Sequence, residues 1–80
     1  MQPNFVIYSK TNCGFCTKLA SFMDQKGISY TKLTLGEDYT TEEFIEKFGR
    51  NQTFPRVLLE EELIGGMRET VTYLVDNEYV

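Results

Sequence analysis

The sequence predicts an α/β fold with the element order β-α-β-α-β-β-α, in which a mixed four-stranded sheet is flanked by helices on both faces. Three observations support this prediction. Short runs rich in β-branched and aromatic residues alternate with longer segments whose apolar residues recur at helical spacing. The last two strand-like runs are close enough to form a hairpin. A chain of 80 residues can bury only one small core, so we expect a single domain over 1–80.

In the first half, a strand, a helix and a second strand follow one another. The β-rich run NFVIYS ends at polar residues, which predicts a buried strand over about 4–8. From Phe15 the apolar residues fall on one face of a helix, and Gly27 has the position of a C-terminal stop. Residues 28–35 alternate roughly and are rich in β-branched residues, which predicts the second strand. A strand, a crossover helix and another strand are typical of a parallel pair.

The second half contains a helix, a hairpin and a final helix. Thr40 and Glu43 have the spacing of a capping box, and apolar residues follow on one face of the helix that begins there. The pattern predicts a strand over 56–60 and its antiparallel partner over 61–64, with the turn near Glu61. A Gly-Gly pair then breaks the chain, and the apolar spacing predicts a last helix from 67 to about 77.

The composition argues against several classes of function. Twelve acidic residues oppose eight basic ones, the net charge is −4, and no basic run is present, so we expect no nucleic-acid surface. The chain lacks an apolar run of bilayer length and a signal-peptide pattern, which predicts a cytoplasmic protein without membrane contact. Histidine is absent and there are only two cysteines, so the chain alone cannot complete a zinc site or a Cys-His nucleophilic pair.

Both cysteines lie in the stretch TNCGFCTK, where the first strand leads into the first helix. Amide groups at a helix start stabilise a thiolate, and Lys10 adds a positive charge nearby, so we expect Cys13 to be the exposed nucleophile. Cys16 lies on the same side of the helix but on its apolar face, which predicts a more buried, resolving thiol. The alternatives are two unreactive cysteines, half of a zinc site, or a structural disulfide, which a reducing compartment disfavours.

Three motifs together resemble the glutaredoxin family. CGFC (13–16) is similar to the family's Cys-Pro-Tyr-Cys centre, TFP (53–55) to its Thr-Val-Pro, and IGG (64–66) to its Gly-Gly turn. The order of the predicted elements matches the family along nearly the whole chain, and its brevity resembles the small bacterial and phage members. The resemblance implies a thioredoxin-like fold and favours redox exchange at the two cysteines over the alternatives.

The resemblance also implies a groove that binds glutathione and substrate, formed by Lys10, Phe15, Gln52, Thr53, Phe54, Pro55, Gly65, Gly66 and Glu69. It implies that Pro55 is cis and leaves the Phe54 backbone open to a substrate that docks as an extra short strand. The amides of the Gly-Gly turn, next to a helix start, can hold a carboxylate. Lys10 and Gln52 match positions where the family contacts the glycine carboxylate of glutathione.

Taken singly, these features have simpler interpretations. TFP alone is an ordinary proline at a strand entry, and Gly-Gly alone is a turn between hairpin and helix. Lys10 and Gln52 alone are solvated surface residues, and Phe15 alone packs in the first helical turn. The chain also departs from the family after Gly-Gly, where it has MRET. Arg68 replaces an Asp or Ser, and Glu69, one methylene longer, stands where an aspartate meets the amino group of glutathione. Either change can weaken glutathione binding, or Arg68 can pair with a glutathione carboxylate.

The leading expectation is a glutathione-dependent thiol–disulfide oxidoreductase that acts in electron transport and cell redox homeostasis as a monomer. The resemblance implies glutathione and disulfide-containing client proteins, such as ribonucleotide reductase, as its partners. One alternative is a glutaredoxin-like electron donor that a thioredoxin reductase recycles. Another is a [2Fe–2S] scaffold, in which Cys13 and glutathione hold the cluster between two chains; Gly14, in place of the family's proline, keeps this alternative open.

Overall fold

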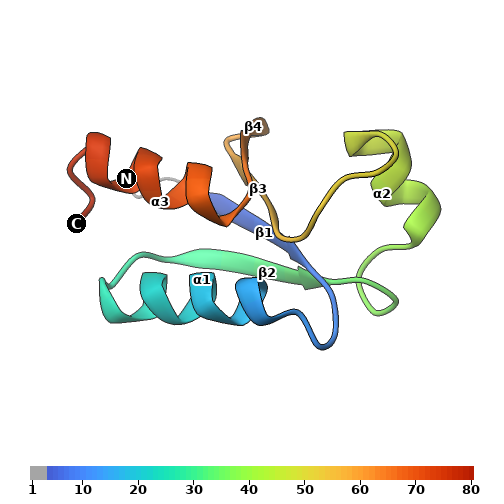
Figure 1. Ribbon diagram of the computed structural model, residues 1–80, viewed down its shortest axis with the longest axis horizontal. Helices are drawn as coiled ribbons and strands as arrows, with labels where there is room; N and C mark the ends of the chain where they lie inside the picture. Colours follow the sequence, from blue (N-terminus) through green and yellow to red (C-terminus); the bar gives the residue numbers. More distant parts are fainter. Residues whose placement is uncertain (1–3) are drawn as a thin grey trace.

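The structure, a computed structural model, describes residues 4–80 and contains the predicted elements in the predicted order (Figure 1). They are β1 (Phe5–Ser9), α1 (Gly14–Gln25), β2 (Tyr30–Thr34), α2 (Thr41–Phe48), β3 (Arg56–Leu59), β4 (Glu62–Gly65) and α3 (Met67–Asp76). Within residues 4–80, no helix has both the length and the apolar character needed to cross a membrane.

The strands form one mixed sheet in the order β2-β1-β3-β4. β1 pairs in parallel with β2, with Tyr8 opposite Leu33, and antiparallel with β3, with Ile7 opposite Val57. β3 and β4 form the antiparallel hairpin that the sequence predicts. The α/β class and the mixed four-stranded sheet are therefore confirmed.

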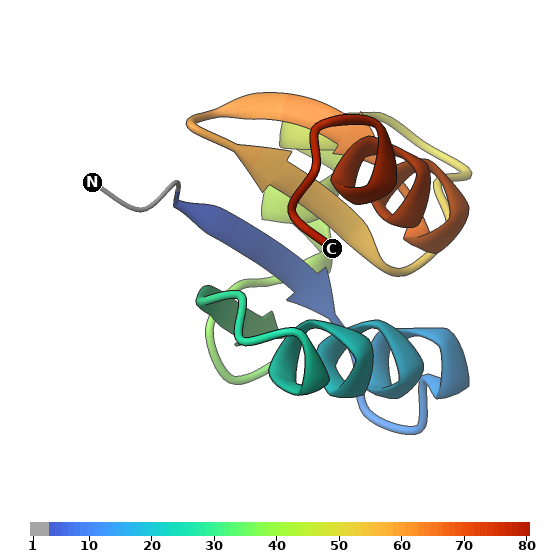
Figure 2. The same cartoon turned by 90° about the vertical axis from the view of Figure 1, so that its left-hand side faces the viewer.

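One face of the sheet packs against α1 and α3. A cluster with no exposed surface forms the core there: Phe5, Ile7, Leu19, Met23, Val57 and Leu74. Because side chains alternate along a strand, Phe5 and Ile7 point to this face and Tyr8 to the other. Figure 2 shows α1 and α3 in front of the sheet and α2 behind it, so helices cover both faces as predicted.

The other face of the sheet holds α2 through aromatic rings. The Tyr8 ring lies 5.0 Å from the rings of Tyr39 and Phe48, centroid to centroid, in edge-on arrangements. Phe44 stacks on Phe54 with 4.6 Å between ring centroids. Aromatic pairs contribute about 0.5–1.5 kcal/mol each beyond their buried area, so this cluster joins α2 to both β1 and the segment before β3.

The N-terminus of α2 has the predicted capping box. The Glu43 N–H donates to Thr40 Oγ1 at 3.1 Å, and the Thr40 N–H donates to Glu43 Oε1 at 2.9 Å. The two side chains thus satisfy amide groups that a helix start otherwise leaves without partners.

Apart from the start of β3, the strand boundaries differ from the prediction by one or two residues. Ile28 lies outside β2, because its N–H donates to the Met23 C=O at 2.9 Å and so closes the end of α1. Glu60 and Glu61 both have positive φ and make the hairpin turn, which confirms the turn predicted near Glu61, and β4 begins one residue later than predicted. Alternation of apolar residues cannot reveal the hydrogen bond of Ile28, since this bond depends on the local path of the backbone.

Candidate active site

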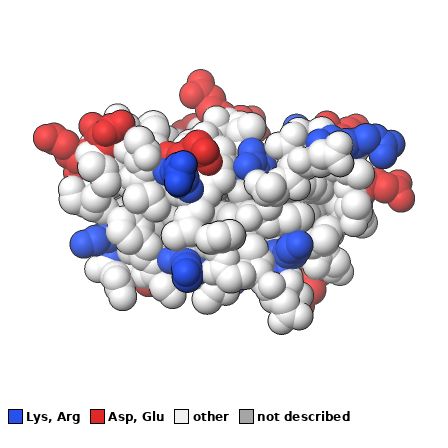
Figure 3. Space-filling view, in the orientation of Figure 1, with Lys and Arg blue, Asp and Glu red and all other residues white. Residues whose placement is uncertain are grey.

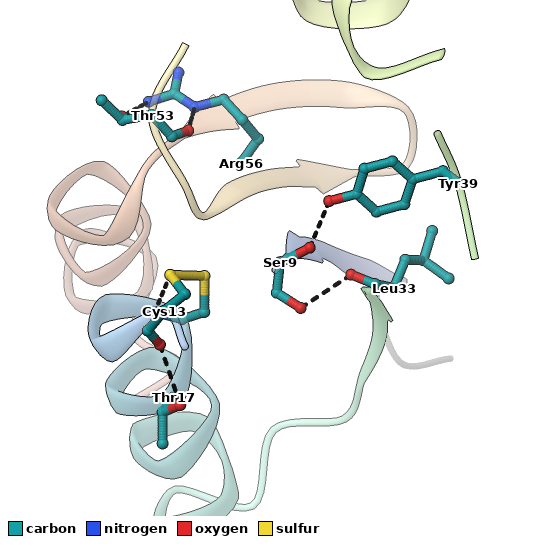
Figure 4. The surroundings of a disulfide bond; sticks show 8 residues. Ser9, Cys13, Thr17, Leu33, Tyr39, Thr53 and Arg56 are labelled. Carbon is teal, nitrogen blue, oxygen red and sulfur yellow. Dashed lines mark hydrogen bonds between the residues drawn. A yellow bond between two sulfur atoms is a disulfide. The ribbon is translucent and has the colours of Figure 1, made fainter. Parts of the chain in front are cut away.

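The two cysteines lie at the start of α1, where a disulfide joins them. Cys13 is the N-cap residue, and its sulfur accepts a hydrogen bond from the Cys16 N–H at 3.2 Å. The Cys13 C=O accepts a hydrogen bond from the Thr17 N–H at 3.1 Å, as the first bond of the helix. The helix start therefore directs an N–H group at the Cys13 sulfur (Figure 4). In the reduced protein, this arrangement favours a thiolate at Cys13.

The prediction of an exposed Cys13 is wrong for this disulfide form. Cys13 is only 9% exposed, because its sulfur folds back onto the first turn of α1 and bonds to Cys16. The predicted difference between the two cysteines is confirmed, since Cys16 is 1% exposed and shares the buried side of α1 with Leu19. Cys13 is the more accessible of the two, which suits the attacking role.

A buried polar network anchors the strand that leads to the cysteines. The Ser9 hydroxyl donates to the Leu33 C=O at 3.0 Å, and the Ser9 C=O accepts from the Tyr39 hydroxyl at 2.5 Å (Figure 4). The Leu35 N–H donates to the same Ser9 C=O at 2.9 Å. Burial raises the pKa of Tyr39 to about 12, so its phenol stays protonated and remains a donor at neutral pH. The end of β1 is therefore fixed just before the cysteine loop.

Phe54 is held by its side chain, while its backbone is free. The Lys10 ammonium lies 5.2 Å from the centroid of the Phe54 ring, which also stacks on Phe44. The Phe54–Pro55 peptide bond is cis, as the resemblance implies. Among residues 4–80, no hydrogen bond uses the N–H or the C=O of Phe54. These two groups are available to an extended chain that lies alongside.

The Gly-Gly turn lies at the start of α3, and its amide already has a partner. The Gly66 N–H donates to Glu69 Oε1 at 2.8 Å. This hydrogen bond, followed by one from the residue's own N–H, lowers the pKa of the Glu69 carboxyl. Glu69 thus folds back and occupies the Gly66 amide, so a ligand's carboxylate would have to displace Glu69 to bind there.

Gly65 is required where it lies. It has φ +136°, and a Cβ added there would stand 2.8 Å from the Glu69 Cβ. Any other residue would therefore combine an unfavourable backbone conformation with a steric overlap. The first glycine of the pair thus allows α3 to begin with Glu69 in its capping position.

A groove of about 620 Å³ lies between the segment that precedes β3 and the start of α3. Its lining is Phe15, Thr53, Phe54, Pro55, Arg56, Gly66, Met67, Arg68, Glu69, Val71 and Thr72. Of the predicted site, the structure brings Phe15, Thr53, Phe54, Pro55, Gly66 and Glu69 together in this lining. The predicted residues outside this lining are Lys10, Cys13, Cys16, Gln52 and Gly65, although Phe15, between the two cysteines, belongs to it. Phe15 is 61% exposed, so it forms a wall of the groove and does not pack in the core.

The groove lining also contains five residues that are not among the predicted site residues: Arg56, Met67, Arg68, Val71 and Thr72. Arg56 directly follows the TFP motif, and this adjacency was the signal that could have drawn attention to it. Met67 and Val71 are spaced four apart on α3, so they lie on one helical face. That spacing predicts a helix but does not tell whether the face meets the core or a groove.

The groove has a different charge balance from the whole chain. Its lining contains two arginines, Arg56 and Arg68, against one acidic residue, Glu69, although the chain has a net charge of −4. In the view of Figure 3, basic groups surround a largely uncharged middle and most acidic groups lie toward the rim. An anionic small molecule would therefore meet attraction in the groove and not the repulsion that the net charge suggests.

Comparisons with known proteins agree with this geometry. The family model described as Glutaredoxin matches residues 5–64. Glutaredoxin 3 of Escherichia coli K12 is 33% identical over 66 residues, which are 81% of this chain and 78% of the relative. Glutaredoxin 1 of Rickettsia conorii is 28% identical over 64 residues, which are 76% of this chain but only 62% of that protein's length.

A solved structure is similar along almost the entire chain. The crystal structure of a buckwheat glutaredoxin–glutathione complex superposes with a TM-score of 0.76 at 25% sequence identity. The match covers 96% of this chain and 73% of the buckwheat chain.

Proposed function

Because the chain belongs to the glutaredoxin family, and is therefore a thiol–disulfide oxidoreductase, we propose that it uses glutathione to reduce protein disulfides and glutathione mixed disulfides. The observation that supports this proposal best is the Cys13–Cys16 disulfide at the start of α1, with the Cys16 N–H donating to the Cys13 sulfur. A donor in this place stabilises the negative charge that Cys13 bears both as attacking and as leaving group.

The proposed reaction begins from the reduced protein. The Cys13 thiolate attacks one sulfur of the substrate disulfide, forms a mixed disulfide and releases the other substrate sulfur as a thiolate. The Cys16 thiolate then attacks the Cys13 sulfur, which releases the second substrate thiolate and forms the Cys13–Cys16 disulfide. The substrate disulfide gains two electrons and the protein dithiol loses two. Two glutathione thiols, in two successive exchanges, reduce the protein again and leave as glutathione disulfide.

We propose that the substrate docks as an extended chain against the free N–H and C=O of Phe54. Backbone pairing of this kind is tolerant of sequence, which suits an enzyme with many disulfide-containing clients. Ribonucleotide reductase is one such client that family resemblance implies. A monomeric single-domain protein in the cytoplasm would meet both these clients and a pool of reduced glutathione.

The groove offers complementary charges for glutathione, which has two carboxylates and one ammonium group. Glu69 uses Oε1 for the Gly66 amide, so we propose that its other carboxylate oxygen faces the ammonium group. Arg68 lines the groove and can attract the neighbouring γ-glutamyl carboxylate. Lys10 and Gln52 flank the same segment and remain our proposed partners for the glycine carboxylate.

The test is glutathione-dependent reduction of a small mixed disulfide by the wild type, Cys16→Ser and Cys13→Ser. We expect turnover in the wild type and in Cys16→Ser, since Cys13 alone can exchange a glutathionyl group, and none in Cys13→Ser. A wild type that is inactive with glutathione but accepts electrons from a thioredoxin reductase would reject the glutathione proposal in favour of the donor alternative.

The [2Fe–2S] alternative gains no support from the observed geometry. Within residues 4–80, no group of three or more cysteine or acidic side chains is placed to hold a metal ion, so a cluster would require a second chain and glutathione. Visible absorption after anaerobic purification would favour this alternative over the exchange reaction.

A further inference from the structure

Arg56 donates three hydrogen bonds to the segment just before it. Its Nε donates to the Thr53 C=O at 3.0 Å, and its Nη2 donates to Thr53 Oγ1 at 3.0 Å (Figure 4). Its Nη1 also donates to Gln52 Oε1 at a longer 3.4 Å. The planar guanidinium thus holds one residue from two directions, a geometry that a lysine ammonium cannot reproduce.

The same guanidinium lies beside the opposite wall of the groove. A Cβ added to Gly66 would stand 3.2 Å from Arg56 Nη2, so the side chain passes close to the start of α3. The hydrogen bond from Gly66 is the main cause of the lowered pKa of Glu69, and the nearby charge of Arg56 adds to it. Arg56 therefore lies between the segment that precedes Pro55 and the capping carboxylate of α3.

These contacts decide which backbone groups a partner can use. The Thr53 C=O is already bonded to Arg56, whereas the N–H and C=O of Phe54 have no partner within residues 4–80. The first free pair of backbone groups before Pro55 therefore belongs to Phe54. A chain that docks here is directed to Phe54 and away from Thr53.

We infer that Arg56 is a positioning residue that orders Thr53 and so sets the register in which an extended disulfide substrate lies beside Cys13. This inference rests on the proposed docking of substrate against Phe54. It concerns residues 52–56 only, and it predicts an effect on substrates with a peptide backbone that exceeds any effect on small disulfides. A purely structural role of Arg56 would affect both kinds of substrate alike.

The experiment compares two substrates in single-turnover reduction by the reduced protein, so that glutathione is not needed. One is a peptide with an extended segment that contains a disulfide-bonded cysteine, and the other is hydroxyethyl disulfide. For Arg56→Met we expect the ratio of the two second-order rate constants, peptide over small disulfide, to fall about tenfold, the equivalent of one charged hydrogen bond. Arg56→Lys keeps the positive charge but loses the planar pair of N–H groups that holds Thr53. The ratio of the rate constants should therefore fall nearly as far as in Arg56→Met.

Arg50→Met is the matched control, because it removes an equal charge from an exposed position in the preceding loop. It should leave the ratio as in the wild type. An equal loss on both substrates, or Arg56→Lys behaving as the wild type, would overturn the inference. If Arg56→Met does not fold, Thr53→Val, which removes only the Oγ1 acceptor, should shift the ratio in the same direction.

A second measurement does not depend on the disulfide-exchange activity of the protein. Nitrogen-15 relaxation of the reduced protein should show that Arg56→Lys raises the backbone mobility of Thr53 and Phe54, while Ala20 in α1 is unaffected. Unchanged mobility at Thr53 and Phe54 would contradict the inference even if the enzyme proved inactive. Failure of the wild type with glutathione, in contrast, would reject the proposed function and leave this measurement decisive for Arg56.

Discussion

The two walls of the groove differ in whether their backbone groups already have hydrogen-bond partners. Before β3, the N–H and C=O of Phe54 have no partner within residues 4–80, and side-chain contacts with Phe44 and Lys10 hold the residue in place. At the start of α3, the Gly66 N–H is bonded to the chain's own Glu69. The first wall is therefore ready to pair with a substrate backbone, whereas the second is already satisfied.

This difference shows that a sequence motif can be present while the backbone groups that it suggests for ligand binding are already bonded within the protein. Both TFP and Gly-Gly suggest backbone groups that a ligand could use, but only the first leaves them free. At the second, the side chain three residues after Gly66 reaches the amide first. A ligand carboxylate there has to displace Glu69 or bind other groups, such as the side chain of Arg68.

The largest effect on stability should come from Gly65→Ala, in the wall at the start of α3. The backbone conformation alone costs roughly 1–3 kcal/mol for a residue other than glycine, and the overlap with the Glu69 Cβ adds to this. Urea denaturation should show a clearly lower free energy of unfolding. Gly14→Ala is the control, since a Cβ there meets nothing within 4 Å and the helix position favours alanine. Equal stability of the two variants would disprove the proposed role of Gly65.

A smaller effect on stability should come from Phe54→Ala, in the wall that precedes β3. The variant loses the stacking on Phe44 and the contact with Lys10, for an expected cost of about 1–2 kcal/mol at this half-buried position. The exposed Phe15 provides the control, because Phe15→Ala should change the free energy of unfolding by less than about 0.5 kcal/mol. Thermal or urea unfolding of both variants would test this; similar losses would show that Phe54 is not anchored.

The smallest effect should come from Glu69→Gln, and it should depend on pH. The folded-state pKa of Glu69 is lowered from 4.5, so its cap stabilises the fold above that pH and the contribution is lost as the pH falls through the lowered value. The melting temperature of the wild type should exceed that of Glu69→Gln at neutral pH, and the two should converge in acid. Glu62→Gln, at an exposed residue of β4, should show no such convergence. A difference that persists in acid would contradict the capping role.

Much of the fold follows from patterns along the chain. The alternating and helical periods predicted every element in order, and the Thr40–Glu43 spacing predicted the start of α2. The turn of the hairpin near Glu61 was predicted as well. The start of β2 was not, because the Ile28 N–H bonds to the end of α1 and periodicity contains no information about such a bond.

The candidate site divides in the same way. The sequence by itself determined the spacing of Cys13 and Cys16, their place at a helix start and the greater burial of Cys16, since these depend on local geometry and on one apolar helix face. Only the tertiary structure decided that Glu69 occupies the Gly66 amide and that Arg56 holds Thr53. Both contacts join residues three apart, but a flexible polar side chain has several partners within that reach, and only the folded path of the backbone selects one of them.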